Sequence, residues 1–497
     1  MPTDSILDRI AAATRRDLAA RQAAAPLDEL RARIATLPAP RPFGRAVSPR
    51  LEGPARLVAE VKRASPSKGL LAERFDPAAQ ARAYERGGAA AISVLTEPHF
   101  FQGSLDHLRA VREVVGVPVL RKDFILDPYQ VYEAREVGAD ALLLICALLD
   151  DATLAELLAL TRSLGMEALV EVHDAAEVRR ALAVGATVIG VNSRDLRTFE
   201  INPDVVRDLR PLVPNEVTFV AESGISSATD MARVRAFGGD AILVGEALMR
   251  AADPVAKARE LAHAPGGATV DLFTPGGRPF VKLCGLTKPE QVELAIDLNA
   301  SAFGLVFAPS HRHVTLAQAD ALAETVLHSD GSIRAIGVFV NEEPCVIEQI
   351  AATLALDAVQ LSGDETPELC AEVAALAHCH VIKAVRLRTE ADLDRLDAYA
   401  MAGATLLLDT PAPAGVYGGT GQTADWALAR EAARRWPIIL SGGLTPENVA
   451  TAIAAVRPAG VDVSSGIETN HVKDPDKMRA FVQAVRAAAN QEIEAIQ

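Results

Sequence analysis

Short apolar segments recur at nearly regular intervals along the chain, and each is followed by a turn and a helical pattern rich in Ala, Leu, Glu and Arg. In the first half, these segments begin near residues 56, 89, 118, 141, 167, 188, 218 and 241. The spacing averages roughly 26 residues, which suits one strand plus one helix. Because the segments are continuously apolar rather than alternating, they predict parallel strands that are buried on both faces.

The second half repeats this pattern, with segments that begin near residues 279, 302, 334, 358, 381, 406, 438 and 460. Two successive sets of strand–helix units predict an α/β protein made of two consecutive (β/α)8 barrels, also called TIM barrels. A doubly wound sheet is the alternative fold, but such sheets seldom use eight units of this regularity.

Gly and Pro mark the expected boundary between the two domains. Residues 264–278 are rich in both and suit a linker between a first domain, 1–263, and a second domain, 279–497. Residues 1–50 precede the first strand and carry helical patterns over 6–23 and 27–35, then a Pro- and Arg-rich segment. From the pattern alone, this extension is either a surface decoration or a cap over one mouth of the first barrel.

The composition agrees with two packed domains and narrows the function. The 497 residues are 49% hydrophobic but only 4% aromatic, so Ala, Val, Leu and Ile must fill the cores. A formal charge of −15 without a long basic run argues against nucleic acid and anionic membranes as partners. The first residues lack an apolar signal segment, no apolar run reaches membrane length, and the five cysteines lack paired spacing. We therefore expect a cytoplasmic protein without a disulfide framework.

Active sites in barrels of this kind lie at the carboxyl ends of the strands. In the first barrel, five strand ends carry polar side chains, which are costly to bury unless they pair or function. These are Glu60 and Lys62, Lys122 and Asp123, Glu171, Asn192 and Arg194, and Glu222 and Ser223. Such a set can exchange protons, and the alternative is a structural network of ion pairs. Gly224 and Gly245, near the ends of the seventh and eighth strands, fit a backbone cradle for a phosphate.

In the second barrel, Cys284 ends the first strand and Asp409 ends the sixth. A thiolate and a carboxylic acid would form a general acid/base couple, and Arg312 would partner a carboxylate. The phosphate pattern returns in a set of small and polar residues: Gly419, Gly442, Gly443, Asp462, Ser464 and Ser465. Residues 378–380, His-Cys-His, suggest a metal, but no second cluster has matching spacing, so we expect no metal site.

Longer motifs carry a resemblance to two known families. EVKRASPSKG (60–69), RKDF (121–124), EVH (171–173), NSRDL (192–196) and AESGIS (221–226) resemble indole-3-glycerol-phosphate synthase. KLCGLT (282–287), FAPSHRHV (307–314), LLDT (407–410), GGTGQTADW (418–426), SGGLTPENV (441–449) and VDVSSGIE (461–468) resemble phosphoribosylanthranilate isomerase. The order of the motifs is similar to that in the fused bifunctional enzyme of tryptophan biosynthesis.

The resemblance implies two consecutive reactions. The C-terminal barrel would isomerise N-(5-phosphoribosyl)anthranilate to 1-(2-carboxyphenylamino)-1-deoxyribulose 5-phosphate, with Asp409 as acid, Cys284 as base and Arg312 positioning the substrate. The N-terminal barrel would convert that product to indole-3-glycerol phosphate with loss of carbon dioxide and water, and Lys122 would be its general acid. In that barrel the resemblance also assigns Glu171 to dehydration, Glu60 and Lys62 to supporting roles, substrate contacts to Ser65, Asn192, Arg194, Glu222, Ser223, Gly224 and Gly245, and an apolar wall to Phe101 and Phe124.

The resemblance further implies that the N-terminal extension covers the mouth of the first barrel and that neither metal nor organic cofactor is needed. We expect a monomer, because fusion associates the barrels without a dimer interface. Three places depart from the families' pattern: Ser362 replaces a frequent His, Glu246 stands where a small residue is common, and residues 469–474 replace a Pro-Gly turn.

Two alternatives remain open to test. The first is a pair of phosphate-binding barrels from another pathway, such as the sugar isomerases of histidine synthesis. Those are expected to use a pair of Asp residues, one at the end of the first strand and one at the fifth, whereas the first strands of these barrels carry Glu60 and Cys284. The second is a chain in which one barrel has lost catalysis and serves as a scaffold, which the acid/base set in each half disfavours.

Overall fold

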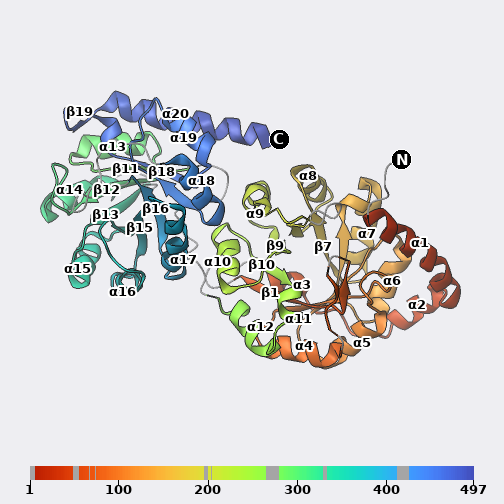
Figure 1. Cartoon of the computed structure of the whole chain (residues 1–497). Coiled ribbons are helices and arrows are strands. Elements are labelled where there is room, and N and C mark those ends of the chain that lie inside the picture. The colour runs from red at the N-terminus through yellow and green to blue at the C-terminus, as the bar shows by residue number, and fades with distance from the viewer. Residues whose placement is uncertain are drawn as a thin grey trace. The chain divides into compact units, whose positions relative to one another are not determined.

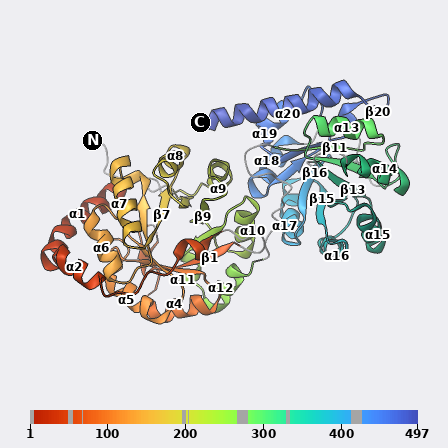
Figure 2. The ribbon, with the colours of Figure 1, turned by 180° about the vertical axis from the view of Figure 1, so that it is seen from behind.

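The computed structural model describes residues 6–48, 55–66, 68–72, 74–194, 200–202, 204–264, 279–327, 333–410 and 425–496. Internal contacts divide the chain into two compact units, Met1–Gly266 and Gly267–Gln497. Each unit is a closed barrel of parallel strands with helices around it (Figures 1 and 2), which confirms the predicted fold class. Most of the expected linker, 265–278, lies outside the described residues, so the domain boundaries stay a prediction.

The strands of the first barrel pair in chain order, and the last closes onto the first. They are β1 (Arg56–Val61), β4 (Ala91–Leu95), β5 (Val119–Lys122), β6 (Ala141–Ile145), β7 (Glu167–Val172), β8 (Val188–Asn192), β9 (Thr218–Glu222) and β10 (Ala241–Val244). A small hairpin, β2 (Ala64–Ser65) with β3 (Gly69–Leu70), follows β1. The residues of β4, β6, β8, β9 and β10 are all buried, which explains why their sequences are mostly apolar.

Helices connect these strands, and most begin at an Asp or Ser whose side chain accepts a hydrogen bond from a free backbone N–H of the first turn. Such caps are Asp76, Ser104, Asp127, Asp150, Asp174, Ser227 and Asp253. The helices are α4 (Pro77–Arg86), α5 (Leu105–Val114), α6 (Pro128–Glu136), α7 (Asp151–Ser163), α8 (Ala175–Ala183), α9 (Val205–Leu209), α10 (Ala228–Ala236), α11 (Glu246–Met249) and α12 (Pro254–Ala262).

The second barrel has the same order of parallel strands. They are β11 (Phe280–Cys284), β12 (Ala302–Val306), β13 (Arg334–Phe339), β14 (Ala358–Leu361), β15 (His380–Arg386), β16 (Thr405–Asp409), β17 (Ile438–Leu440) and β18 (Gly460–Val463). Its helices are α13 (Pro289–Asp297), α14 (Leu316–Leu327), α15 (Pro344–Leu354), α16 (Pro367–Ala377), α17 (Leu393–Met401), α18 (Trp426–Arg435), α19 (Val449–Val456) and α20 (Pro475–Ile496). A hairpin, β19 (Glu468–Thr469) with β20 (Val472–Lys473), precedes α20.

Alternation along the strands decides which side chains reach the barrel interior. In β1, Leu57 and Ala59 pack in the apolar layer under the helices, whereas Val58 belongs to the interior cluster. Because strand neighbours point to opposite faces, Glu60 shares the interior face with Val58. In β11, Phe280 belongs to the interior cluster of the second barrel, so Lys282 and Cys284 face inward above it.

The N-terminal extension forms α1 (Ile6–Ala24), α2 (Leu27–Ile34) and α3 (Phe43–Val47), of which α3 was not predicted. At the mouth of the first barrel, α1 contacts the loop after β4: Asp17 Oδ2 lies 2.6 Å from His99 Nε2, and Arg9 lies over the Phe100 ring. At the opposite end, the Gly44 N–H donates to Glu167 at the start of β7, at 2.6 Å. The extension therefore covers part of the mouth, as expected, and also closes the foot of the barrel.

No helix among the described residues is long and apolar enough to cross a membrane.

We expect Phe43→Ala to destabilise the first unit by about 3–5 kcal/mol, because the Phe43 side chain is fully buried at the foot of the barrel. The two tryptophans, Trp426 and Trp436, both lie in the second unit. Urea unfolding followed by tryptophan fluorescence therefore reports the second unit, whereas far-ultraviolet circular dichroism reports both. In Phe43→Ala, only part of the dichroism change should therefore move to a lower urea concentration.

The matched control is Phe481→Ala, which removes a fully buried ring from α20 of the second unit. This variant should shift the fluorescence transition. A dichroism curve of Phe43→Ala that superimposes on that of the parent chain would show that the unit does not depend on α3.

Candidate active sites

A cavity of about 450 Å³ opens at the carboxyl ends of the first barrel's strands. The structure brings together there every side chain that the sequence placed at this mouth. These are Glu60, Lys62, Ser65, Phe101, Lys122, Asp123, Phe124, Glu171, Asn192, Arg194, Glu222, Ser223, Gly224 and Gly245. The convergence follows from barrel closure, because all eight strands end at the same rim.

Lys122 is the centre of this site. Its ammonium, at the end of β5, lies 2.8 Å from Glu171 Oε2 and 2.9 Å from Glu222 Oε2. Both carboxylates are almost completely buried. The Glu222 carboxylate fits in this position because residue 190 is Gly. A Cβ at 190 would lie 2.1 Å from Glu222 Oε1. One buried cation therefore serves two buried carboxylates.

The charges of this trio set one another's pKa values. Burial opposes the charge of Lys122, but Glu171, Glu222 and Glu60 outweigh it and raise the pKa of the ammonium. For Glu171, burial is outweighed by Lys122 and His173, which lower the pKa of that carboxyl. Burial raises the pKa of Glu222 to about 7, although Lys122 acts against it. Two carboxyls on one ammonium thus differ in proton affinity, as proton exchange near neutral pH requires.

A second ion pair lies beside the trio. Lys62 Nζ is 2.5 Å from Glu60 Oε1. Gly245 makes room for this pair, because a Cβ there would lie 2.3 Å from Glu60 Oε1. Opposite, the Ser223 hydroxyl donates to Asn192 Oδ1 at 2.8 Å. Ser223 and Gly224 have φ of 67° and 74°, a left-handed pair that ends β9 in a sharp turn at the rim.

The remaining lining of this cavity combines an apolar wall with a paired charge. The rings of Phe101 and Phe124 lie 6.1 Å apart between centroids and give the cavity a face suited to a planar ring. Glu246, the residue that departs from the family pattern, begins α11 and pairs with Arg250 at 3.3 Å. Both line the cavity, so Arg250 offsets the carboxylate that would repel a phosphate.

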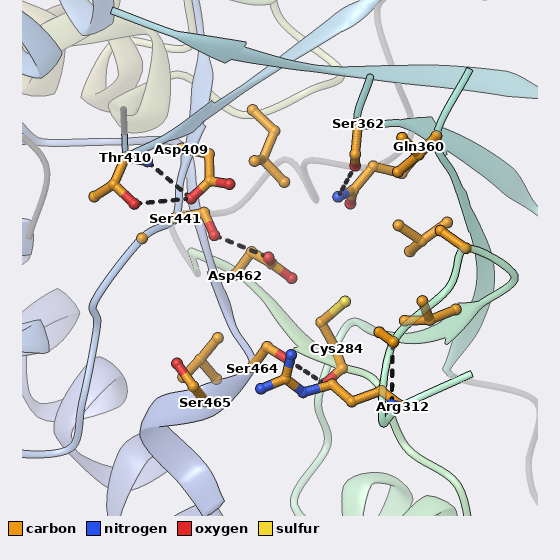
Figure 3. Close-up of a pocket in the computed structure, with 18 of the residues that line it drawn as sticks. Cys284, Arg312, Gln360, Ser362, Asp409, Thr410, Ser441, Asp462, Ser464 and Ser465 are labelled. Atoms are coloured by element: carbon orange, nitrogen blue, oxygen red, sulfur yellow. Dashed lines mark hydrogen bonds between the residues drawn. The ribbon is translucent and has the colours of Figure 1, made fainter. Parts of the chain in front are cut away.

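The second barrel has a cavity of about 400 Å³ at the same end of its strands. It is lined by Cys284, Arg312, Ser362, Asp409, Gly442, Gly443, Asp462, Ser464 and Ser465, all singled out from the sequence (Figure 3). Gly419, the remaining candidate, lies outside the described residues.

Cys284 and Asp409 enter this cavity from opposite sides, and the sulfur points into its centre (Figure 3). Burial raises the pKa of the Asp409 carboxyl and so favours its protonated form. The hydrogen bond from the Thr410 backbone N–H and the charge of Arg386 act in the opposite direction. Burial also raises the pKa of the Cys284 thiol, against the lysines Lys282 and Lys473. The pair thus has the geometry of an acid and a base acting on one bound molecule.

Arg312 is held by a carboxylate that sequence reasoning did not identify. Glu468 accepts from Arg312 Nε at 2.6 Å and from Arg312 Nη2 at 2.9 Å, and Lys473 Nζ donates to it at 2.7 Å. Burial alone would raise the pKa of Glu468, but these two cations lower it to about 2. Lys473 belongs to the β19–β20 hairpin, so the unusual segment 469–474 supplies one of the two cations that hold Glu468.

Two further polar groups were missed. Lys282 Nζ lies 2.7 Å from Asp462 Oδ1, whose other oxygen accepts from Ser441 at 3.0 Å. Gln360 donates from Nε2 to Ser362 Oγ at 3.0 Å, and its buried Oε1 has no partner among the described residues. The signal for both was present, since each is a polar residue inside an otherwise apolar strand.

Backbone geometry near the last two strands suits an anion. Gly442 and Gly443 have φ of 83° and 62°, so the chain turns sharply after β17. Neither position tolerates a side chain without strain. Ser464 and Ser465 line the same cavity as these glycines. Both follow β18, so the glycine turn and these serines line the cavity where the sequence predicts a phosphate cradle, and the cradle itself stays a prediction.

Among the described residues, one cluster has the spacing of metal ligands: His311, Glu468 and His471. Glu468 is already shared by Arg312 and Lys473, so a metal ion there would face two positive charges at close range. The donor set therefore does not fit a resident metal.

Comparisons with known proteins divide the chain in the same way. A family profile described as indole-3-glycerol phosphate synthase matches residues 7–261, and one described as N-(5'-phosphoribosyl)anthranilate isomerase matches residues 281–484. A multifunctional tryptophan biosynthesis protein of Schizosaccharomyces pombe is 40% identical over 86% of this chain, which spans 59% of that relative's length.

Two further proteins are each similar to about half of this chain or less. The indole-3-glycerol phosphate synthase of Roseiflexus castenholzii is 53% identical over 52% of this chain and 98% of its own length. The crystal structure of phosphoribosyl anthranilate isomerase from Thermotoga maritima is 40% identical, covers 42% of this chain and 99% of that one, and superimposes with a TM-score of 0.38.

We expect Lys122→Met to cost about 3–5 kcal/mol of unfolding free energy near pH 8 and much less near pH 5. Without the ammonium, the buried Glu171 and Glu222 hold protons that the unfolded chain has already released. Stability therefore falls as pH rises above the unfolded carboxyl pKa. The measurement is urea unfolding followed by circular dichroism at both pH values.

The control is Lys257→Met, which removes a surface pair with Glu260 and should cost less than about 1 kcal/mol at either pH. A Lys122→Met deficit of equal size at pH 5 and pH 8 would contradict the shared-charge account.

Proposed function

Because the chain belongs to the family of indole-3-glycerol phosphate synthases, here followed by a phosphoribosylanthranilate isomerase domain, we propose that it catalyses two consecutive steps of tryptophan biosynthesis. The observation that carries the proposal is that each barrel mouth holds its own complete set of proton-exchanging groups. An isomerase and a ring-closing lyase each need such a set, and a scaffold barrel would need none.

The C-terminal barrel isomerises N-(5-phosphoribosyl)anthranilate. Asp409 gives its proton to the ribose ring oxygen, the C1'–O bond breaks, and an iminium forms between C1' and the nitrogen. Cys284, as thiolate, takes the proton from C2'. The resulting enolamine becomes the ketone of 1-(2-carboxyphenylamino)-1-deoxyribulose 5-phosphate as a proton returns at C1'. Arg312, fixed by Glu468, is placed to bind the anthranilate carboxylate.

The N-terminal barrel converts this ketone to indole-3-glycerol phosphate. The Lys122 ammonium donates to the carbonyl oxygen, which allows the ring carbon that bears the carboxylate to attack the carbonyl carbon. The carboxylate leaves as carbon dioxide, which restores the aromatic ring, and the new hydroxyl leaves as water. Glu171, hydrogen-bonded to Lys122, exchanges the protons of dehydration. Phe101 and Phe124 flank the anthranilate ring.

Phosphate binding follows from the turns after the seventh and eighth strands of each barrel. We place one phosphate at Ser223, Gly224 and Gly245, with Arg250 as a nearby cation. The second phosphate is placed at Gly442, Gly443, Ser464 and Ser465. In both cases, backbone N–H groups bind an anion despite the acidic total charge of the chain.

We infer a cytoplasmic monomer, since the fusion already joins the two barrels. Sedimentation at micromolar concentration tests the oligomeric state.

We expect Lys122→Met to lose indole formation by about 10²–10⁴-fold while isomerisation continues, and Asp409→Asn to do the reverse. Each variant removes a proton donor from one mouth only. Each step is assayed separately, with phosphoribosylanthranilate or with the deoxyribulose product as the starting compound. Urea unfolding followed by circular dichroism checks that the mutated barrel is still folded in each variant, and the unaffected activity checks the other barrel. If either substitution silenced both activities in a folded chain, the two-site proposal would fail.

We expect Cys284→Ser to lower the kcat of isomerisation by about 10²–10⁴-fold and to leave KM within about threefold, because it removes a base rather than a binding contact. The control is Cys345→Ser, which changes an exposed cysteine on α15 and should leave both constants unchanged. A variant with higher KM and unchanged kcat would assign Cys284 to binding instead.

A further inference from the structure

Lys282 is a fully buried lysine that the mechanism above does not use. It lies in β11, two residues before Cys284, so both side chains point into the barrel. Below them, the interior is closed by apolar residues that include Phe280, Ile336 and Ile382. A charge at this depth is costly unless a specific partner stabilises it.

Asp462 is that partner. Lys282 Nζ donates to Asp462 Oδ1 at 2.7 Å, and Ser441 donates to Asp462 Oδ2 at 3.0 Å. Asp462 outweighs the effect of burial and raises the pKa of Lys282 to about 12. The ammonium therefore remains charged while groups above it gain or lose protons. It also has donors to spare, because Asp462 takes only one of three.

The Cys284 sulfur shares the space above Gly304 with this ammonium. A Cβ at Gly304 would lie 2.7 Å from Cys284 Sγ and 3.2 Å from Lys282 Nζ. Strand pairing places Gly304 directly beside Cys284. The absence of a side chain at 304 thus leaves one space that both the sulfur and the ammonium border. Burial raises the pKa of the thiol, Asp462 raises it further, and Lys282 is the foremost group that lowers it.

We propose that Lys282, tethered by Asp462, is the positioning residue that stabilises Cys284 as a thiolate inside the second barrel. This inference rests on the proposed isomerase function for its consequence, since a buried cysteine can remove a carbon-bound proton only as the thiolate. Asp462 then has a double effect: it fixes the ammonium but also opposes the negative charge on sulfur. The two partners therefore act on the thiol in opposite directions.

The test is titration of the thiolate by its absorbance near 240 nm in the full chain. Each variant is measured against the same variant carrying Cys284→Ser, so that the other four cysteines cancel. We expect Lys282→Met to raise the midpoint by about one pH unit or more, a tenfold loss of thiolate below the midpoint. Asp462→Asn should lower the midpoint, and Lys282→Arg should restore part of the wild-type value.

Removal of Lys282 alone leaves Asp462 buried without its counter-charge, which can prevent folding. Lys282→Met combined with Asp462→Asn replaces both charges by neutral groups and should fold, as judged by the fluorescence of Trp426 and Trp436 in the same unit. Its thiolate midpoint should still lie above that of the parent chain. A structural ion pair predicts instead that the double variant regains the parent midpoint.

The pH profile of isomerase kcat/KM gives the second readout. The part of the profile that rises as Cys284 loses its proton should shift with the midpoint of the thiolate titration. Equal midpoints in all variants, or shifts of one sign for Lys282→Met and Asp462→Asn, would overturn the inference. A parent chain without isomerase activity would refute the proposed function, whereas the titration would still decide the role of Lys282.

Discussion

Closure of eight parallel strands into a barrel brings the carboxyl end of every strand to one rim, and both sites depend on this constraint. Residues from β1, β5, β7, β8 and β9, up to 162 positions apart in the chain, meet in one cavity of the first barrel. The same closure packs their other faces under helices, so the rim side chains stand on a rigid, apolar base. Position along the strand and parity of the residue number decide which side chains become functional.

The two barrels stabilise the buried charges at their mouths in different ways. In the first barrel, one ammonium is shared by two carboxylates, and Glu222, with a pKa of about 7, is poised to change its protonation state. In the second, Lys282 pairs with Asp462, Arg312 and Lys473 share Glu468, and Cys284 and Asp409 line the same cavity without an ion pair of their own among the described residues. In the first barrel the proton-exchanging groups are themselves ion-paired, whereas in the second the ion pairs surround a separate acid and base.

Sequence reasoning located the barrels and the rim because both follow from periodicity. The strand starts at 56, 141, 167, 188 and 218 agree with the structure, and the rim residues follow from strand ends. Local signals did not predict α3, because this short helix lies in a Pro- and Arg-rich segment and is held by a hydrogen bond to Glu167, far away in the sequence. Glu468 was missed for another reason: its role depends on Arg312, 156 positions away. Lys282 is conspicuous as a polar residue in an apolar strand, but its partner Asp462 lies 180 positions away and only the folded chain brings the two together.

The central claim is that one chain carries both reactions, and a single-pot assay tests it most directly. The purified chain is given phosphoribosylanthranilate in the presence of a chelator, and both anthranilate fluorescence and indole-3-glycerol phosphate are followed. We expect the fluorescence to fall and the indole product to appear. Accumulation of the deoxyribulose phosphate without indole, or no turnover from either starting compound, would contradict the assignment of one working site to each barrel.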